Sequence, residues 1–228
     1  MTMTLAFDVY GTLIDTRGVE QQLQALMGEQ APAFSQMWRD KQLEYSFRRG
    51  LMQNYQSFAV CTAQALDYCC QAFQIALTAE QKQSLLDVYK VLPAHADVKQ
   101  GLTELQGLGF KMFAFSNGKR EAVELLLKTA GIDHLFLSVV SADDVQSFKP
   151  NPAVYAYFLQ QANTTADKAW LISSNPFDVT GAISAGMQAA WIQRSKQTVF
   201  DPWEIQAKLV VASLTELAES LPKYKSAV

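Results

Sequence analysis

An aspartate eight residues into the chain is the first side chain whose position suggests chemistry. Asp8 ends the short apolar run Leu5–Phe7 and is followed closely by Tyr10, Gly11 and Thr12. An apolar run that ends in a carboxylate and a glycine turn is typical of a buried parallel strand, and open α/β folds bind their ligands at the carboxyl ends of such strands. We therefore expect Asp8 to act as a nucleophile.

A hydroxyl and an amide follow the next predicted core strand, Met112–Ser116. Ser116 and Asn117 precede Gly118, and a helix is expected to begin near Lys119. Backbone N–H groups at the start of a helix, together with a serine hydroxyl, form a seat for an anion. A substrate carboxylate would fit this seat.

Two later clusters carry a cation and a second acid. Lys149 comes after a predicted strand and just before a helix that starts with proline, which fixes its backbone and directs its ammonium inward. Ser173 and Asn175 follow another apolar strand, and Asp178 is the only carboxylate of that cluster. The order aspartate, serine, lysine, aspartate on successive strand ends is far more specific than any one of these residues.

Composition excludes several classes of function. The chain has 228 residues, of which 49% are hydrophobic, so it can bury a large core. A formal net charge of -3 argues against the basic surface that nucleic-acid or anionic-membrane binding requires. No stretch approaches the roughly 18 consecutive apolar residues of a membrane span, and the start Met1–Thr4 is not typical of a secretory signal. We expect no nucleic-acid partner and no membrane partner.

The three cysteines indicate a reducing compartment. Cys61, Cys69 and Cys70 form an odd set without the spacing of a metal site. Such a set is typical of reduced thiols in a cytosolic protein. We expect these side chains to pack in the core of a helix, and the protein to be cytoplasmic.

The spacing of apolar residues divides the chain into two parts. From about Val19 to Tyr89 the pattern is helical throughout, and Thr78 with Gln81 forms a helix start of the capping-box kind. From about Asp97 short strands alternate with helices, as in a doubly wound sheet. The first strand must pair across the helical segment, so that segment is expected to lie over the strand ends and to share a cleft with them.

The predicted fold is α/β, a doubly wound, Rossmann-like parallel sheet with an inserted helical cap subdomain. We expect the core domain to comprise residues 1–14 and 96–228, and the cap to comprise residues 15–95. The predicted core elements after the cap are the strands Met112–Ser116, Leu137–Ser141, Trp170–Ser173, Ala189–Ile192 and Leu209–Val211, and the helices Gly101–Leu108, Glu121–Thr129, Pro152–Gln161, Val179–Ala185 and Leu214–Leu221.

Together these residues resemble the haloacid dehalogenase superfamily, in which a nucleophilic aspartate, a hydroxyl, a lysine and a final acidic motif occur in this order. The likeness extends to its L-2-haloacid dehalogenase branch and spans nearly the whole chain. The opening motif Asp-x-Tyr-Gly-Thr-Leu stands at 8–13, the cap segment Trp-Arg-x-Lys-Gln-Leu-Glu-Tyr at 38–45, and the closing Ser-Ser-Asn-x-x-Asp at 173–178.

The resemblance implies hydrolysis of short-chain L-2-haloacids to D-2-hydroxyacids and halide by a homodimer. Asp8 would displace the halide from the rear and form an ester, and water would then attack the aspartyl carbonyl, so the substrate carbon is inverted once. Asp178 would act as the base for that water or orient it, with Asn175, Ser173 and Lys149 positioning the water.

A negatively charged substrate and a departing halide require fixed positive charge beside Asp8. Two unit charges about 4 Å apart interact by roughly 4 kcal/mol at an intermediate dielectric. Lys149 and Arg39 would supply the offsetting charge, with Arg39 facing the halide. The remaining expected site residues are Thr12 in the catalytic set, Tyr10, Ser116, Asn117 and Tyr155 at the substrate, and Phe58, Asn117 and Phe177 as the walls around the halide.

Two positions depart from the metal-dependent phosphatases of the superfamily. Those enzymes carry an acid two residues after the nucleophile and a pair of late aspartates that helps to hold Mg²⁺. Here the same positions hold Tyr10 and the pair Ser173–Ser174. Asp8 and Asp178 alone are few ligands for a hard cation. We expect no metal and no other cofactor.

Two alternatives stay open. One is a Mg²⁺-dependent small-molecule phosphatase on the same fold, against which Tyr10 argues. The other is a non-catalytic relative that kept the fold. Against this alternative, every position that the mechanism needs holds a residue able to perform its role.

Overall fold

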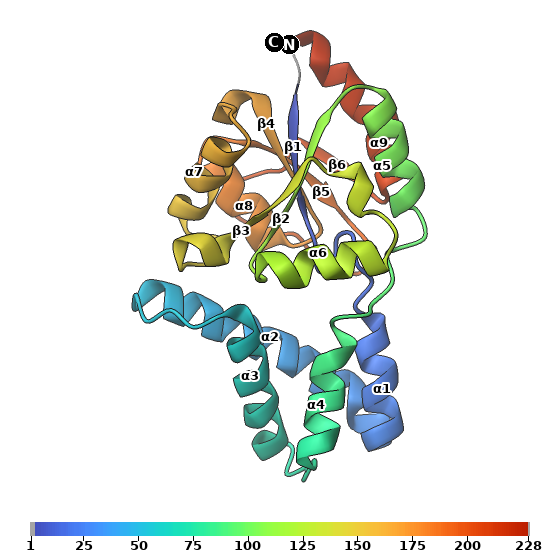
Figure 1. Ribbon diagram of the computed structural model, residues 1–228, viewed down its shortest axis with the longest axis vertical. Coiled ribbons are helices and arrows are strands. Elements are labelled where there is room, and N and C mark those ends of the chain that lie inside the picture. The colour runs from blue at the N-terminus through green and yellow to red at the C-terminus, as the bar shows by residue number, and fades with distance from the viewer. Residues whose placement is uncertain (1–2, 228) are drawn as a thin grey trace.

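The computed structural model describes residues 3–227 and contains a six-stranded sheet with helices on both faces (Figure 1). All paired strands are parallel, in the order β3-β2-β1-β4-β5-β6. The predicted doubly wound α/β fold is confirmed. Met1, Thr2 and Val228, which fall within the predicted core domain, lie outside the described residues. The strands are β1 (Thr4–Asp8), β2 (Lys111–Ser116), β3 (Ser138–Ser141), β4 (Ala169–Ser173), β5 (Gln188–Ile192) and β6 (Leu209–Val211).

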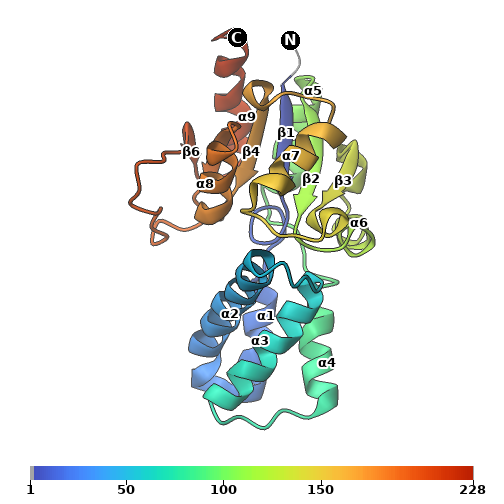
Figure 2. The same cartoon turned by 90° about the vertical axis from the view of Figure 1, so that its left-hand side faces the viewer.

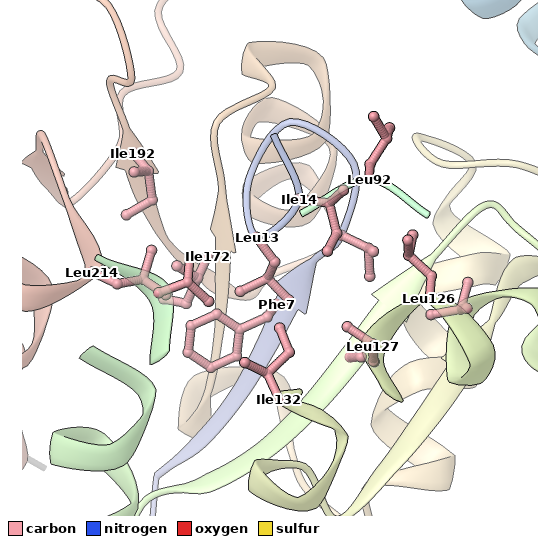
Figure 3. Packing of buried hydrophobic residues seen from close by; sticks show 14 of the residues in the cluster. Phe7, Leu13, Ile14, Leu92, Leu126, Leu127, Ile132, Ile172, Ile192 and Leu214 are labelled. Carbon is pink, nitrogen blue, oxygen red and sulfur yellow. The ribbon is translucent and has the colours of Figure 1, made fainter. Parts of the chain in front are cut away.

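Different helices cover the two faces of the sheet. The α-helices are α1 (Arg17–Met27), α2 (Ala31–Leu51), α3 (Phe58–Ala72), α4 (Ala79–Val88), α5 (Val98–Gly107), α6 (Arg120–Thr129), α7 (Pro152–Gln161), α8 (Pro176–Ser184) and α9 (Leu214–Ser220). Leu5 and Phe7 of β1 pack with residues of α5, α6 and α9, whereas Ala6 packs with residues of α7 and α8. Figure 3 shows the first of these faces, where Phe7 lies among Leu127, Ile132 and Ile172. The near-continuous apolar strands therefore reflect burial on both sides.

The polar residues at the strand ends come together because all strands run in one direction. Asp8 ends β1, Ser116 ends β2 and Ser173 ends β4, and β1 lies between the other two strands. The strand order reverses between β1 and β4, which is the kind of switch point where open α/β sheets bind ligands. Asp8 therefore lies where the topology favours a site.

Helices α1–α4 lie together below this edge of the sheet, and both ends of the chain lie at the opposite edge (Figures 1 and 2). The segment that leaves the core and the segment that returns to it run side by side. Asp15 N donates to Pro93 O at 2.8 Å, and His95 N donates to Leu13 O at 3.0 Å. This arrangement presents the helical insert to the carboxyl ends of the strands.

Two local predictions in the helical insert are confirmed. Thr78 caps α4 in a capping box, since its side chain accepts from Gln81 N while the Gln81 side chain accepts from Thr78 N. Cys61, Cys69 and Cys70 are buried free thiols in α3. None of the helices described within residues 3–227 combines the length and apolar character that crossing a membrane requires.

The core elements match their predicted positions with differences at the ends. Helix α7 and strand β6 have the predicted bounds, whereas α8 begins at Pro176 rather than at Val179. Proline is favoured in the first turn of a helix because its missing N–H has no partner there. Asp178 consequently lies in the first turn of α8, where its backbone is fixed.

Candidate active site

Four donors surround the carboxylate of Asp8. One oxygen, Oδ1, accepts from Lys149 Nζ at 2.8 Å. The other, Oδ2, accepts from Thr12 Oγ1 at 2.8 Å, from Asn175 Nδ2 at 2.7 Å and from Ser173 Oγ at 3.2 Å. All four donors are predicted site residues from three separate parts of the chain. Because Oδ2 carries three hydrogen bonds and Oδ1 only one, Oδ1 keeps more of its lone-pair capacity for a reaction.

Lys149 lies between two buried carboxylates. Its Nζ donates to Asp8 at 2.8 Å, to Asp178 Oδ2 at 2.6 Å and to Phe115 O at 3.2 Å, so all three ammonium protons are used. The side chain is 1% exposed. Asn117 supports the Lys149 backbone, since its Oδ1 accepts from Lys149 N at 2.8 Å.

The charges of the triad formed by Asp8, Lys149 and Asp178 move the pKa values of the two acids apart. Burial alone would raise the pKa of Asp8, but the charge and hydrogen bond of Lys149, with the hydrogen bonds of Thr12 and Asn175, lower that pKa below its ordinary value of 3.8. Burial raises the pKa of Asp178 to about 6; Lys149 opposes this rise and the charge of Asp8 adds to it. Burial also opposes the charge of Lys149, but the two carboxylates outweigh it and raise the pKa of its ammonium. Near neutral pH the nucleophile is therefore ionised, and the second acid titrates close to the working range of a general base.

Tyr155 lies behind Asp178. Its hydroxyl donates to Asp178 Oδ1 at 2.8 Å, and its side chain is fully buried. A Cβ added to Gly181 of α8 would lie 2.5 Å from that hydroxyl, so the glycine permits the close approach of α7. Tyr155 is thus buried behind Asp178 and does not line the cavity described below, and its contact with the substrate stays a prediction. Because α7 covers a face of the sheet, this tyrosine reaches Asp178 from the core side.

Arg39 of α2 connects the helical insert to the strand ends. Its Nη2 donates to Asn175 Oδ1 at 2.8 Å, and the Asn175 amide donates in turn to Asp8. One side chain thus separates the guanidinium from the carboxylate. An anion that forms beside Asp8 would lie within reach of the positive charge of Arg39.

A cavity of about 310 Å³ opens between the insert and the strand ends. Tyr10, Arg39 and Phe58 line it, as do Gly118 and Lys119 at the start of α6. Burial raises the pKa of Tyr10 to about 12, so its hydroxyl keeps its proton. The structure thus brings three of the predicted pocket residues to one cavity next to the Asp8 turn.

The other predicted pocket residues lie around this cavity but do not line it. Ser116 is buried, and its Oγ accepts from Gly118 N at 3.1 Å, while the Asn117 carboxamide is directed to Lys149. Phe177 packs edge to face against Phe47 of α2, with ring centroids 5.2 Å apart. Phe177 therefore forms part of the contact between the insert and the core rather than of the cavity wall.

Among the residues that line the cavity, sequence reasoning missed two buried polar ones, Gln42 and Thr62. Both are buried, and Gln42 Nε2 donates to Thr62 Oγ1 at 2.5 Å. A signal for Gln42 was available, because it follows Arg39 by three positions in a predicted helix and residues so spaced share a helix face.

Both the sequence and the fold of this chain resemble those of known proteins. Residues 2–186 match the family model of haloacid dehalogenase-like hydrolases. The chain is 34% identical over 217 residues to (S)-2-haloacid dehalogenase 2 of Pseudomonas sp. (strain CBS-3), covering 95% of this chain and 94% of that one. It also superposes on two structures of L-2-haloacid dehalogenase from Xanthobacter autotrophicus. The first has a TM-score of 0.90 at 28% identity, covering 98% and 99% of the two chains. The second, with chloropropionic acid covalently bound, has a TM-score of 0.90 at 27% identity, covering 97% and 99%.

Proposed function

Because this chain belongs to the haloacid dehalogenase-like hydrolases, we propose that it hydrolyses short-chain L-2-haloacids to D-2-hydroxyacids and halide. The observation that carries the proposal is the buried triad of Asp8, Lys149 and Asp178 at the switch point of the sheet, with Arg39 one side chain away. An ionised carboxylate with a lowered pKa is a weak base, and in a dry site it can attack carbon.

In the first step Asp8 Oδ1 attacks the halogen-bearing carbon from the side opposite the halogen. A carbon–oxygen bond forms, the carbon–halogen bond breaks, and its electron pair leaves with the halide. Arg39 stabilises the charge that develops on the leaving group, a charge absent from the bound substrate, so its contribution lowers the barrier. Lys149 remains paired with Asp178 while the Asp8 charge is consumed.

In the second step water attacks the carbonyl carbon of the Asp8 ester. Asp178 accepts one proton of the water, and the bond between the carbonyl carbon and the ester oxygen breaks. The departing oxygen takes the other water proton and becomes the product hydroxyl, and Asp178 then releases its proton to solvent. The product hydroxyl oxygen therefore comes from Asp8, and the water oxygen stays on the regenerated carboxylate. Since the substrate carbon reacts only in the first step, its configuration inverts once.

The substrate carboxylate is held at the start of α6 in this proposal. Ser116 Oγ accepts from Gly118 N, which leaves the Ser116 hydroxyl proton to donate to the carboxylate. Backbone N–H groups at the beginning of α6 favour an anion in the same place. Tyr10, protonated on the cavity wall, closes the pocket over the reacting carbon.

The reaction proposed here needs no metal ion. Within the described residues no three His, Cys, Asp or Glu side chains gather as a set that would hold one. Between Asp8 and Asp178, the two acids nearest such a role, the ammonium of Lys149 already makes ion pairs of 2.8 and 2.6 Å. A hard cation requires several free oxygen ligands, and this donor set does not fit it.

We further propose that the helical insert, residues 15–95, acts as the cap of a core made of residues 1–14 and 96–228, and that a homodimer works in the cytoplasm. The contact of Arg39 with Asn175 supports the cap role, because it brings an insert residue to the reacting centre. Leu51 and Met52 at the end of α2 are exposed and adjacent, as apolar residues of a subunit interface would be in the monomer. Three unpaired thiols suit a reducing compartment.

The direct test is halide release from each enantiomer of 2-chloropropanoate in the presence of a chelator. We expect release from the L enantiomer with D-lactate as the product, and at most trace release from the D enantiomer, because rear attack requires one arrangement of the carboxylate and the halogen. A chelator-sensitive release of phosphate from simple phosphomonoesters, without halide release, would instead establish the phosphatase alternative.

Replacing Tyr155 tests the role of Asp178 as the base. The base must be ionised to accept a proton, so the rate of the wild-type protein should fall as pH drops through about 6. The Tyr155 hydrogen bond favours ionised Asp178, and its loss in Tyr155→Phe should move this decline to higher pH.

A matched control lies on the same helix. Tyr157 also donates to an aspartate, Asp144 Oδ2 at 3.0 Å, but at the surface, so Tyr157→Phe should leave the pH profile of kcat in place. An unmoved acidic decline in Tyr155→Phe would show that Asp178 is not the base.

A further inference from the structure

A polar chain inside the helical insert leads to Arg39 and is not used by the mechanism above. Gln42 is 2% exposed and Thr62 is 6% exposed, and both line the cavity. Buried polar side chains are costly unless they are paired, so their presence between α2 and α3 requires a reason. Their partners supply that reason.

The hydroxyl of Thr62 determines which way the Gln42 amide points. Thr62 Oγ1 donates its single proton to Phe58 O at 2.9 Å, so toward Gln42 it acts as an acceptor. Gln42 must then present its Nε2 to Thr62, at 2.5 Å, and direct Oε1 the other way. That carbonyl oxygen faces Arg39 Nη1 at 3.5 Å.

The core determines the orientation of Asn175 in the same manner. Asn175 Nδ2 donates to Asp8 Oδ2 at 2.7 Å and to Tyr10 O at 3.3 Å, so its Oδ1 is left to accept from Arg39 Nη2 at 2.8 Å. The guanidinium of Arg39 therefore lies between two carbonyl oxygens, one from the insert and one from the core. Two acceptors of fixed direction restrict the orientation of the planar guanidinium group more than a single acceptor can.

The spacing of α2 and α3 is fixed at the same point. Trp38, the neighbour of Arg39, is 1% exposed and donates from Nε1 to Thr62 O at 2.9 Å. Thr62 thus contacts α2 twice, through its backbone carbonyl to Trp38 and through its hydroxyl to Gln42. Neither contact is explained by substrate chemistry, and both keep Gln42 in register with Arg39.

From this geometry we propose that Gln42, oriented by Thr62, is a positioning residue that holds the Arg39 guanidinium against Asn175 and toward the departing halide. The inference rests on the function proposed above for Arg39. At 3.5 Å the Gln42–Arg39 hydrogen bond is long, so we expect it to restrict orientation rather than to add much stability. An arginine side chain has several rotatable bonds, and one directed acceptor removes orientations that point away from the reacting carbon.

The test compares Gln42→Met and Thr62→Val, which keep side-chain size and remove the acceptor or the hydroxyl. Because the charge that Arg39 meets develops during the reaction, kcat for L-2-chloropropanoate should fall about 10- to 100-fold with little change in KM. Thr62→Ser retains the hydroxyl and should restore most of the loss. Thr103→Val is the matched control, since Thr103 makes the same bond to the carbonyl four residues earlier, Lys99 O at 2.7 Å, on an exposed face of α5.

A double-mutant cycle separates positioning from packing. In an Arg39→Ala background the Gln42→Met substitution should cost no further activity, because the group that it positions is gone. Equal losses in both backgrounds, or a Thr62→Ser variant as impaired as Thr62→Val, would overturn the inference and show a role in cap packing alone.

One readout does not depend on the substrate. In a crystal structure of Gln42→Met we expect Arg39 to leave Asn175, and an unchanged contact of 2.8 Å would refute the positioning role even for a protein with another substrate. The wild-type protein could fail to release halide while Arg39 is displaced in the crystal structure of Gln42→Met. That pair of results would count against the proposed function and not against the positioning of Arg39.

Discussion

Asp8→Asn is expected to abolish halide release, with kcat at least about 10⁴-fold lower and the fold retained. An amide cannot form the ester, so no alternative first step remains at this position. The cost in stability should be moderate, about 1–3 kcal/mol, because the new NH₂ group meets donors where the carboxylate accepted hydrogen bonds. Removing one anion still leaves the neutral pair of Lys149 with Asp178.

The measurement combines halide release with thermal unfolding of the same preparation. Asp133→Asn, at an exposed position in the short 3-10 helix Asp133–Leu135, is the control for the chemical change itself and should turn over normally. A second measurement follows the oxygen atoms. After several turnovers in heavy-oxygen water, mass spectrometry of the wild-type protein should find the label on the Asp8 carboxylate, and an unlabelled Asp8 in turned-over protein would contradict the ester mechanism.

Lys149→Met is expected to produce the largest loss of stability, about 3–5 kcal/mol near pH 8. The substitution leaves Asp8 and Asp178 buried with no cation between them. It should also eliminate measurable halide release, since the two carboxylates repel each other and the substrate anion. Without the lysine, the pKa values of Asp8 and Asp178 in the folded variant lie above those in the unfolded chain. As pH falls, the folded variant therefore binds protons before the unfolded chain does, and this stabilises the fold. The difference in stability from the wild-type protein should therefore narrow as pH falls.

Urea unfolding at pH 8 and pH 5.5 measures this difference. Lys82→Met is the matched control, because Lys82 pairs with Asp67 at 2.6 Å on the surface and should cost at most about 1 kcal/mol. A Lys149→Met variant that loses the same stability at both pH values would show that the lysine contributes through packing rather than charge.

The outline of the site could be predicted because a parallel sheet brings distant strand ends together. Asp8, Ser116 and Ser173 end β1, β2 and β4, and alternating strand and helix patterns are enough to place these ends on one edge. The helical insert followed from the change of period after the first strand. The helix boundaries were less predictable where a proline opens the helix, as Pro176 does in α8.

Residues that act through another side chain could not be predicted in the same way. Tyr155 lies at the expected place in α7, but which neighbour its hydroxyl reaches depends on how closely α7 approaches Gly181. Gln42 and Thr62 are common helix residues on two separate helices, and only the packing of α2 against α3 joins them. Sequence patterns report which face of a helix is buried, whereas the direction of an amide is decided by the donors and acceptors around it.

The two ends of the chain lie at the edge of the sheet farthest from the helical insert (Figure 1). A fusion partner or a solid support attached at either end would therefore point away from the mouth of the cavity. Small acids dissolved in water could reach an immobilised form of the protein without crossing the attachment surface. The layout suits a bound catalyst for removing organohalogen compounds from a flowing stream.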